Sequence, residues 1–140
     1  MKVNVIYWSG TGNTEAMANE IVNEINSSGN EGNLIFVGDA TQTDVDDCNV
    51  VIFGCAAMGE DELEEELMRP FMDEANTHIA GKKVGLFGSY EWYEGGWMDI
   101  WEDEIKATGA NLIAPGVKAY DYPDEEALEA CRELAKTAVS

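Results

Sequence analysis

The sequence has very few basic residues: eight lysines and arginines stand against 28 aspartates and glutamates, for a formal net charge of −20 over 140 residues. So acidic a chain repels phosphate backbones and anionic lipid headgroups, which argues against nucleic-acid binding and against binding to anionic membranes. The same charge favours partner proteins that carry a basic patch. Acidic surfaces are also common in soluble proteins, where the charge serves only solubility.

Cysteines and long apolar runs are scarce too. Cys48, Cys55 and Cys131 show no C-x-x-C spacing, which indicates free thiols and neither a metal site nor a disulfide framework. No apolar run approaches the length of a membrane span. The chain starts directly on strand-like sequence without a leader pattern. We therefore expect a cytoplasmic monomer with no bound metal and no membrane association.

Hydrophobic patterning predicts strands that alternate with helices over one domain, residues 1–140. The expected strands cover residues 2–8, 34–37, 50–55, 84–88 and 112–119, the last of them weakened by Pro115-Gly116. The expected helices cover residues 14–28, 63–76, 97–108 and 123–139. Residues 39–47 are polar and predict at most one helical turn. The unbroken apolar runs are typical of strands buried on both faces of a sheet. The alternation predicts an α/β fold with a doubly wound, five-stranded parallel sheet.

The loop after the first strand is made of small residues and hydroxyls, Ser9, Gly10, Thr11, Gly12, Asn13 and Thr14. Free backbone N–H groups at the start of the following helix, together with these side chains, suit a phosphate group. The pattern is neither a dinucleotide G-x-G-x-x-G nor a Walker loop, because no lysine follows the glycines. The alternative is an ordinary turn, since these residue types also dominate turns.

Two later loops also have unusual composition. The third strand is followed by Ala-Ala-Met-Gly-Glu-Asp-Glu, and the fourth by Ser-Tyr-Glu-Trp-Tyr-Glu-Gly-Gly-Trp. In a doubly wound sheet of order 2-1-3-4-5, the loops after strands one, three and four are neighbours at the carboxyl edge. A planar ring could lie there between Met58 and Trp92. None of the eight basic residues lies in these three loops, so a bound phosphate must be held by neutral donors.

Three motifs carry a resemblance to a known family: S-G-T-G-N-T after the first strand, G-C-x-A-M-G with acids after the third, and G-L-F-G-S-Y-x-W at the fourth. With these three motifs in this order along the chain, the sequence resembles the flavodoxins over essentially its whole length. It is most similar to the short-chain clostridial type, because no long insertion splits the fifth strand. The resemblance implies the flavodoxin-like fold and the cofactor FMN.

The resemblance also implies roles for individual residues. The Ser9–Thr14 loop would hold the phosphate, and Ser89 would reach the phosphate or the ribityl chain. Met58 and Trp92 would flank the isoalloxazine ring, Gly59 would face its N(5), and Asp61 would accept a hydrogen bond from its N(3). The remaining cofactor contacts expected in the two later loops are Ala56, Tyr90 and Glu91. We expect Trp8 and Trp97 to be packing residues.

Two departures from the family pattern concern the cofactor loops. Glu91 and Tyr93 stand where the family usually has glycine, and a side chain at a position built for positive φ costs about 1 kcal/mol or more. Ala56 stands where the family often has serine, which removes one hydroxyl from the phosphate site. These departures affect fine geometry and affinity, and FMN remains the expected cofactor.

The resemblance implies a soluble low-potential one-electron carrier that shuttles FMN between semiquinone and hydroquinone for redox partner proteins. Acids in the two ring-binding loops, among them Asp61 and Glu91, would lower the potential and steer basic partners. The alternative is an FMN-dependent NAD(P)H or quinone reductase, which Trp92 over the flavin face would obstruct. A phospho-acceptor receiver is excluded, because strands one and three end in Trp8-Ser9 and Gly54-Cys55 and not in acids.

Overall fold

The computed structural model describes residues 1–59, 61–91 and 95–140. Across these residues six strands form one sheet in which every pairing is parallel. The strands are β1 (Lys2–Trp8), β2 (Glu31–Phe36), β3 (Val50–Cys55), β4 (Lys83–Tyr90), β5 (Asn111–Leu112) and β6 (Val117–Tyr120). Their order is β2-β1-β3-β4-β5, with β6 also paired to β4. The predicted doubly wound order is confirmed.

The expected fifth strand is divided into β5 and β6, which pair with different parts of β4. Pro115, in the gap between them, has no N–H to donate to a sheet ladder. The N–H of Gly116 donates to the Glu102 carboxylate of the neighbouring helix instead of to a strand. The fifth strand expected over residues 112–119 is thus two strands, and the break falls at Pro115-Gly116, where the sequence predicted a weakened strand.

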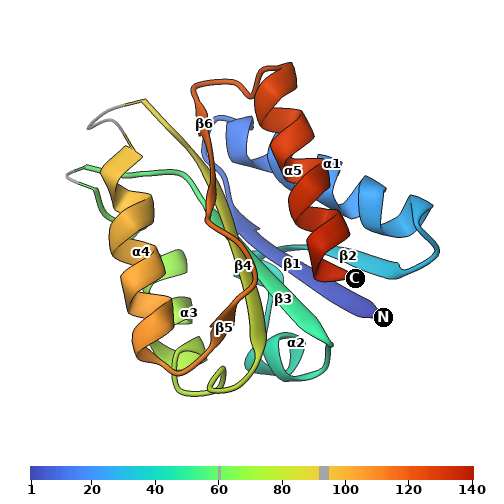
Figure 1. The fold of residues 1–140 in the computed structure, drawn as a ribbon. Helices are drawn as coiled ribbons and strands as arrows, with labels where there is room; N and C mark the ends of the chain where they lie inside the picture. Colours follow the sequence, from blue (N-terminus) through green and yellow to red (C-terminus); the bar gives the residue numbers. More distant parts are fainter. Residues whose placement is uncertain (60, 92–94) are drawn as a thin grey trace.

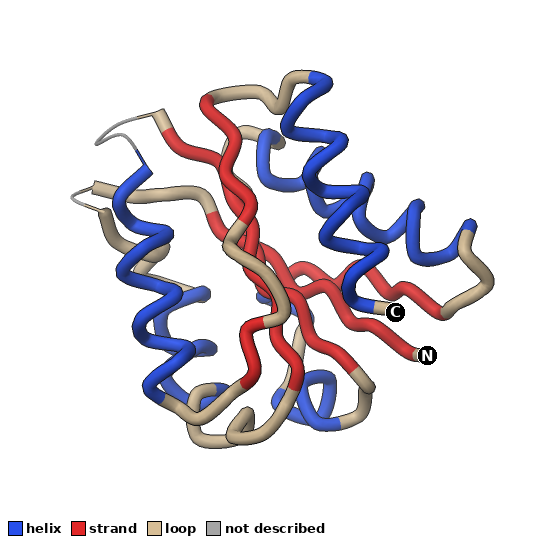
Figure 2. Tube along the Cα trace, in the orientation of Figure 1, coloured by secondary structure: helices blue, strands red, loops and turns tan. Residues whose placement is uncertain are grey.

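Helices cover both faces of the sheet (Figure 1). They are α1 (Asn13–Ser27), α2 (Gln42–Asp46), α3 (Met68–Ala75), α4 (Gly96–Ala107) and α5 (Glu125–Ala138), with a 3₁₀ turn at Val37–Asp39. The first and last of these, α1 and α5, pack side by side on one face, and α3 and α4 cover the other. Strands fill the middle layer between these helices (Figure 2).

Alternating side chains of the central strands supply the two cores between these layers. In β1, Val3 and Val5 face the core under α1 and α5, whereas Ile6 faces the core under α3 and α4. All six residues of β3 are buried, as expected for a strand covered on both faces. Because β1, β3 and β4 are parallel neighbours, their carboxyl ends lie together at one edge of the sheet.

Four element boundaries differ from the predictions by two residues or more, one of them the start of the last helix, which is at Glu125 and not at Pro123. The helix expected over 63–76 begins only at Met68, because residues 65–67 form a turn. Pro70 falls in its first turn, where the missing N–H costs nothing. The fourth strand runs on to Tyr90, so Ser89 is a strand residue and not a loop residue. The second strand starts earlier than expected, at Glu31, where the sequence is polar because β2 is an edge strand.

Candidate functional site

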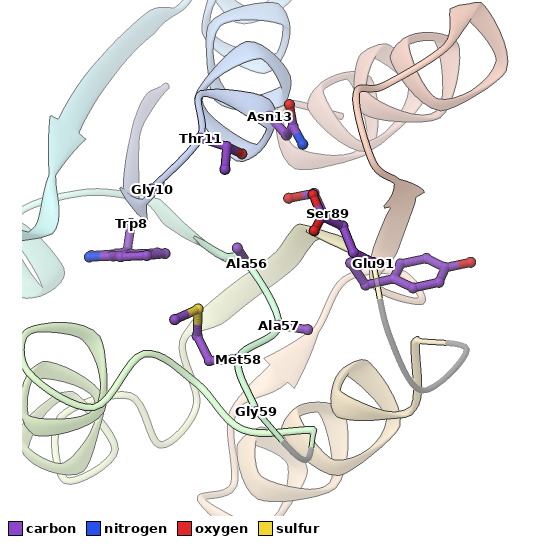
Figure 3. A pocket seen from close by; sticks show the side chains of 11 residues that line it. Trp8, Gly10, Thr11, Asn13, Ala56, Ala57, Met58, Gly59, Ser89 and Glu91 are labelled. Carbon is purple, nitrogen blue, oxygen red and sulfur yellow. The ribbon is translucent and has the colours of Figure 1, made fainter.

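The three loops at the carboxyl edge surround one cavity of about 430 Å³. This volume is in the range of small-molecule sites. The predicted site residues that line it are Gly10, Thr11, Asn13, Ala56, Met58, Gly59, Ser89, Tyr90 and Glu91. Figure 3 shows Thr11 and Asn13 at one end of this cavity, Met58 and Gly59 at the other, and Ser89 and Glu91 along one side. The cavity thus has a hydroxyl-and-amide end and a thioether-and-glycine end.

Four predicted residues do not line the cavity: Ser9, Gly12, Thr14 and Asp61. Trp92 lies outside the described residues. Ser9 and Gly12 shape the first loop from within, because the Ser9 hydroxyl accepts the N–H of Gly12 at 3.1 Å. Gly12 has φ +94°, a left-handed conformation that favours glycine. This turn directs the start of α1 toward the cavity.

The N-terminus of α1 is well suited to an anion. Gly12 precedes the helix, and within the described part of the chain no side chain caps its first N–H groups. Uncapped N–H groups and the helix dipole attract negative charge. The first loop therefore offers backbone donors in addition to the Thr11 hydroxyl and the Asn13 amide.

A buried hydroxyl pair joins the first loop to β4. The Oγ1 of Thr14 lies 2.7 Å from the Oγ of Ser89, and the two residues are 0% and 5% exposed. Each hydroxyl carries one hydrogen. Because one of these hydrogens is used within the pair, only one remains for a ligand. Thr14 reaches the cavity only through Ser89, which lines it.

The loop after β3 makes a tight turn beside the cavity. Met58 and Glu62 exchange two backbone hydrogen bonds of 2.8 and 2.9 Å. Within the turn Gly59 has φ +50° and Asp61 has φ +59°. A Cβ added at Gly59 would have no atom within 4 Å, so its glycine is required by backbone conformation and not by crowding. The turn holds Met58 at the rim, where its side chain is 39% exposed.

Trp8 lines the cavity as well, contrary to the expectation of a packing residue. Its side chain is half-buried, and its ring packs on Gly10, where an added Cβ would lie 2.8 Å from the ring. Figure 3 shows the indole on the side of the cavity near Met58. Its sequence position, last in β1 and directly before the glycine-rich loop, was the signal for this role. Ala57 also lines the cavity, because its N–H is tied to the carbonyl of Ser89 at 2.9 Å.

Asp61 carries a buried acceptor without a partner. Its Oδ1 has no hydrogen bond within the described residues. Its other carboxylate oxygen lies 3.0 Å from the position of a Cβ added at Gly96, so a side chain there would press against this carboxylate. The residue faces a second hollow with Trp97 and Trp101. A buried acceptor that lacks a donor is costly, and a ligand N–H would relieve it.

Comparisons with known proteins agree with this geometry. The flavodoxin family model matches residues 5–134. The chain belongs to the flavodoxin family. It is 42% identical over 97% of both chains to the flavodoxin of Megasphaera elsdenii, and 41% identical over 96% of both chains to that of Clostridium beijerinckii. The solution structure of two-electron reduced Megasphaera elsdenii flavodoxin superposes with a TM-score of 0.86, at 42% identity over 97% of both chains.

Flavodoxins bind FMN and transfer electrons, and they are carriers and not enzymes. The predicted family, cofactor and class are therefore confirmed. The alternative of an NAD(P)H or quinone reductase is not supported by these relatives. The roles given to individual residues stay predictions.

The residues around the cavity fit FMN. Neutral donors and an uncapped helix N-terminus stand at one end, where a phosphate needs them. Met58 and Trp8 give apolar surface near the other end, where a flavin ring needs it. Asp61, whose buried Oδ1 lacks a donor, lines the neighbouring hollow and not this cavity, so its predicted contact with the flavin N(3) stays a prediction.

The positive charge of Lys118 lies near the site, although nothing in the sequence indicated this. No base lies within the loops, yet the fold brings Lys118 of β6 beside the last of them. The Cδ atom of Lys118 lies 3.1 Å from the position of a Cβ added at Gly95. The last loop therefore has beside it a lysine side chain that comes from a strand more than 20 residues further along the chain.

Glu64 stands in an acidic run of the sequence, yet it is only 7% exposed. Its carboxylate accepts the backbone N–H groups of Glu66, Leu67 and Met68 at 2.8 to 2.9 Å, at the start of α3. Burial raises the pKa of this carboxyl, but the three hydrogen bonds outweigh burial and hold the pKa below its ordinary value. Glu64 therefore caps α3 and fixes the end of the third loop.

We predict that Glu64→Gln destabilises the fold by about 1 kcal/mol at pH 7, the usual cost of a lost helix cap. Because the folded pKa is lowered, this stabilisation is present above the ordinary glutamate pKa and is lost as pH falls through the folded value. Urea unfolding should show the difference between wild type and Glu64→Gln shrinking at low pH. The exposed neighbour Glu65 is the control, and a Glu65→Gln effect of equal size would contradict the capping role.

Proposed function

We propose that residues 1–140 act as one FMN-binding domain and as a low-potential one-electron carrier. When bound, FMN takes up and releases single electrons. The protein would use the second of the two one-electron reduction steps of FMN, which has the lower potential. The observation that carries this proposal is the single cavity that joins the uncapped start of α1 to the Met58–Gly59 turn. The order of groups along it matches the order phosphate, ribityl chain and ring.

At the phosphate end, the chain would supply only neutral donors. Thr11 and Asn13 line the cavity, and the start of α1 beside them has no side-chain cap on its N–H groups. Ser89 would add the one hydroxyl hydrogen that its pair with Thr14 leaves free. Ser9 would act indirectly by bonding Gly12 and so holding the loop open toward the ligand.

At the ring end, Met58 and Trp92 would flank the flavin, with Ala56 and Tyr90 beside it and Asp61 accepting the N(3) hydrogen. The left-handed Gly59 can present either its N–H or its carbonyl to the ring edge, since no side chain restricts its peptide. Glu91, which lines the cavity and is exposed, places a negative charge beside the ring.

We further propose that the protein acts in the cytoplasm as a monomer and docks on basic patches of redox proteins. Within the described ranges no helix is long and apolar enough to cross a membrane. The support for basic partners is the charge of −20, since an acidic field attracts basic surfaces and speeds encounter. Association with an acceptor should then slow as ionic strength rises.

Spectra and titrations of the purified protein test the cofactor proposal. The protein as isolated should show the visible absorption of oxidised flavin. The apoprotein should bind FMN far more tightly than riboflavin, because riboflavin lacks the phosphate that the first loop would hold. A colourless protein whose apoprotein binds the two flavins equally would contradict the proposed site.

We predict that Glu91→Gln raises the midpoint potential of the second one-electron step. A charge about 8 Å from the ring contributes about 0.5 kcal/mol, or roughly 20 mV, at water-like dielectric. Lys118→Met should shift the same potential in the opposite direction. Spectroelectrochemistry at low and high salt measures both, and both shifts should shrink at high salt. Shifts of the same sign in the two variants would show that charge is not the cause.

A further inference from the structure

The chain leaves β6 through Asp121, which contacts the start of α1 and the end of β4. The Asp121 N–H donates to the carbonyl of Tyr90 at 2.8 Å, and its Oδ1 accepts from Nδ2 of Asn13 at 3.2 Å. Asn13 and Tyr90 both line the cavity. This turn therefore holds an exposed carboxylate one hydrogen bond away from the phosphate end.

The backbone at Asp121 restricts which residues suit this position. Its φ of +59° is left-handed, and aspartate and asparagine adopt this conformation more readily than other residues with a side chain. Glycine would remove the carboxylate, and asparagine would remove only its charge. The presence of aspartate therefore adds a negative charge that the turn itself does not need.

Asp121 has two opposing effects on a ligand at Asn13. The Nδ2 of Asn13 carries two hydrogens, and the bond to Asp121 uses one of them and orients the other. Orientation of that hydrogen favours binding of a phosphate. The charge of Asp121 opposes it, because carboxylate and phosphate dianion repel each other.

We propose that Asp121 is a positioning and specificity-determining residue of the phosphate site. Its oxygen orients Asn13, while its negative charge limits how tightly the site binds a dianionic phosphate ester. The inference rests on the proposed FMN site. A carboxylate and a dianion about 6 Å apart, at water-like dielectric and physiological salt, weaken binding about threefold.

Asp121→Asn separates the two effects. Asparagine keeps an acceptor oxygen for Asn13 and suits the left-handed backbone, but it carries no charge. The dissociation constant of FMN should fall about threefold at physiological salt, by more at low salt, and by very little in about 1 M salt. Riboflavin, which has no phosphate, should bind both proteins equally. Glu31→Gln, at the amino end of β2 on the opposite edge of the sheet, is the charge-matched control.

A second pair of variants tests the positioning of Asn13. Asp121→Ala removes both charge and acceptor, so it should bind FMN more weakly than Asp121→Asn does. In an Asn13→Ala background this difference should disappear, because there is no amide left to orient. The benefit of removing the charge should persist in that background. Circular dichroism of each apoprotein establishes that the variants are folded.

Flavin fluorescence titrations of wild type and variants decide the outcome. A higher FMN-to-riboflavin affinity ratio in Asp121→Asn, lost at high salt, supports the inference. An unchanged or lower ratio, or an equal change for both flavins, overturns it. If wild type binds the two flavins equally, the proposed function fails on the wild-type titration alone, before any variant is compared.

Discussion

Thr11→Ala should weaken FMN binding by about ten- to 150-fold, the loss expected for one hydrogen bond to a charged group worth about 1.5–3 kcal/mol. Thr11 lines the end of the cavity where we propose that the phosphate binds (Figure 3). With no lysine or arginine in this loop, each neutral donor carries a large share of the interaction. A site of this kind is sensitive to single hydroxyls in a way that a lysine-based phosphate site is not.

Fluorescence titration of apoprotein with FMN measures this loss, and riboflavin serves as the reference ligand. Riboflavin affinity should be unchanged in Thr11→Ala, because the hydroxyl would contact only the phosphate. Thr11→Ser keeps a hydroxyl and should recover most of the affinity. An Ala variant that binds FMN as tightly as wild type would remove Thr11 from the phosphate site.

Gly88→Ala should destabilise the protein by about 3 kcal/mol or more, which is the upper range for overpacking a core. A Cβ at this position would lie 2.1 Å from the carbonyl oxygen of Cys55 and 2.8 Å from the ring of Trp97. The first neighbour is backbone of β3 and cannot rotate away. Relief would push apart the ends of β3 and β4, from which two walls of the cavity start.

The same strand supplies a matched control. A Cβ at Gly85 would meet only side-chain atoms, at 3.3 Å and beyond, so Gly85→Ala should cost about 1 kcal/mol or less. Urea unfolding of both apoproteins gives the comparison, and FMN titration of Gly88→Ala shows whether the loss extends to the site. Equal stability of the two variants would contradict the role assigned to Gly88.

Much of this fold could be predicted because its signals are local. The unbroken apolar run at residues 50–55 predicted β3 with the correct bounds, since a strand buried on both faces needs apolar residues at every position. The small-residue loop before α1 was recognisable for a similar reason. A chain that must turn left-handed at Gly12 and leave N–H groups free needs glycines and short side chains.

Boundaries that depend on contacts between distant residues were predicted less well. The division of β5 from β6 follows in part from Pro115, which the sequence itself marks, and in part from the bond of Gly116 to Glu102 of α4. The late start of α3 follows from the burial of Glu64 and its three backbone bonds. The hydrogen-bond partners of Gly116 and Glu64 cannot be predicted from the local sequence. A glutamate within an acidic run has the same sequence pattern whether its side chain is solvated or buried.

The sequence by itself determined the family, the order of the strands and the three loops that gather at one edge of the sheet, because motif order and hydrophobic period are properties of the chain alone. Only the tertiary structure decided which side chains meet there. It brought Trp8 into the cavity wall, turned Thr14 toward Ser89, and placed Lys118 and Asp121 beside loops far from them in sequence. Charges and hydrogen bonds act through space, so their partners are fixed only when the strands are packed.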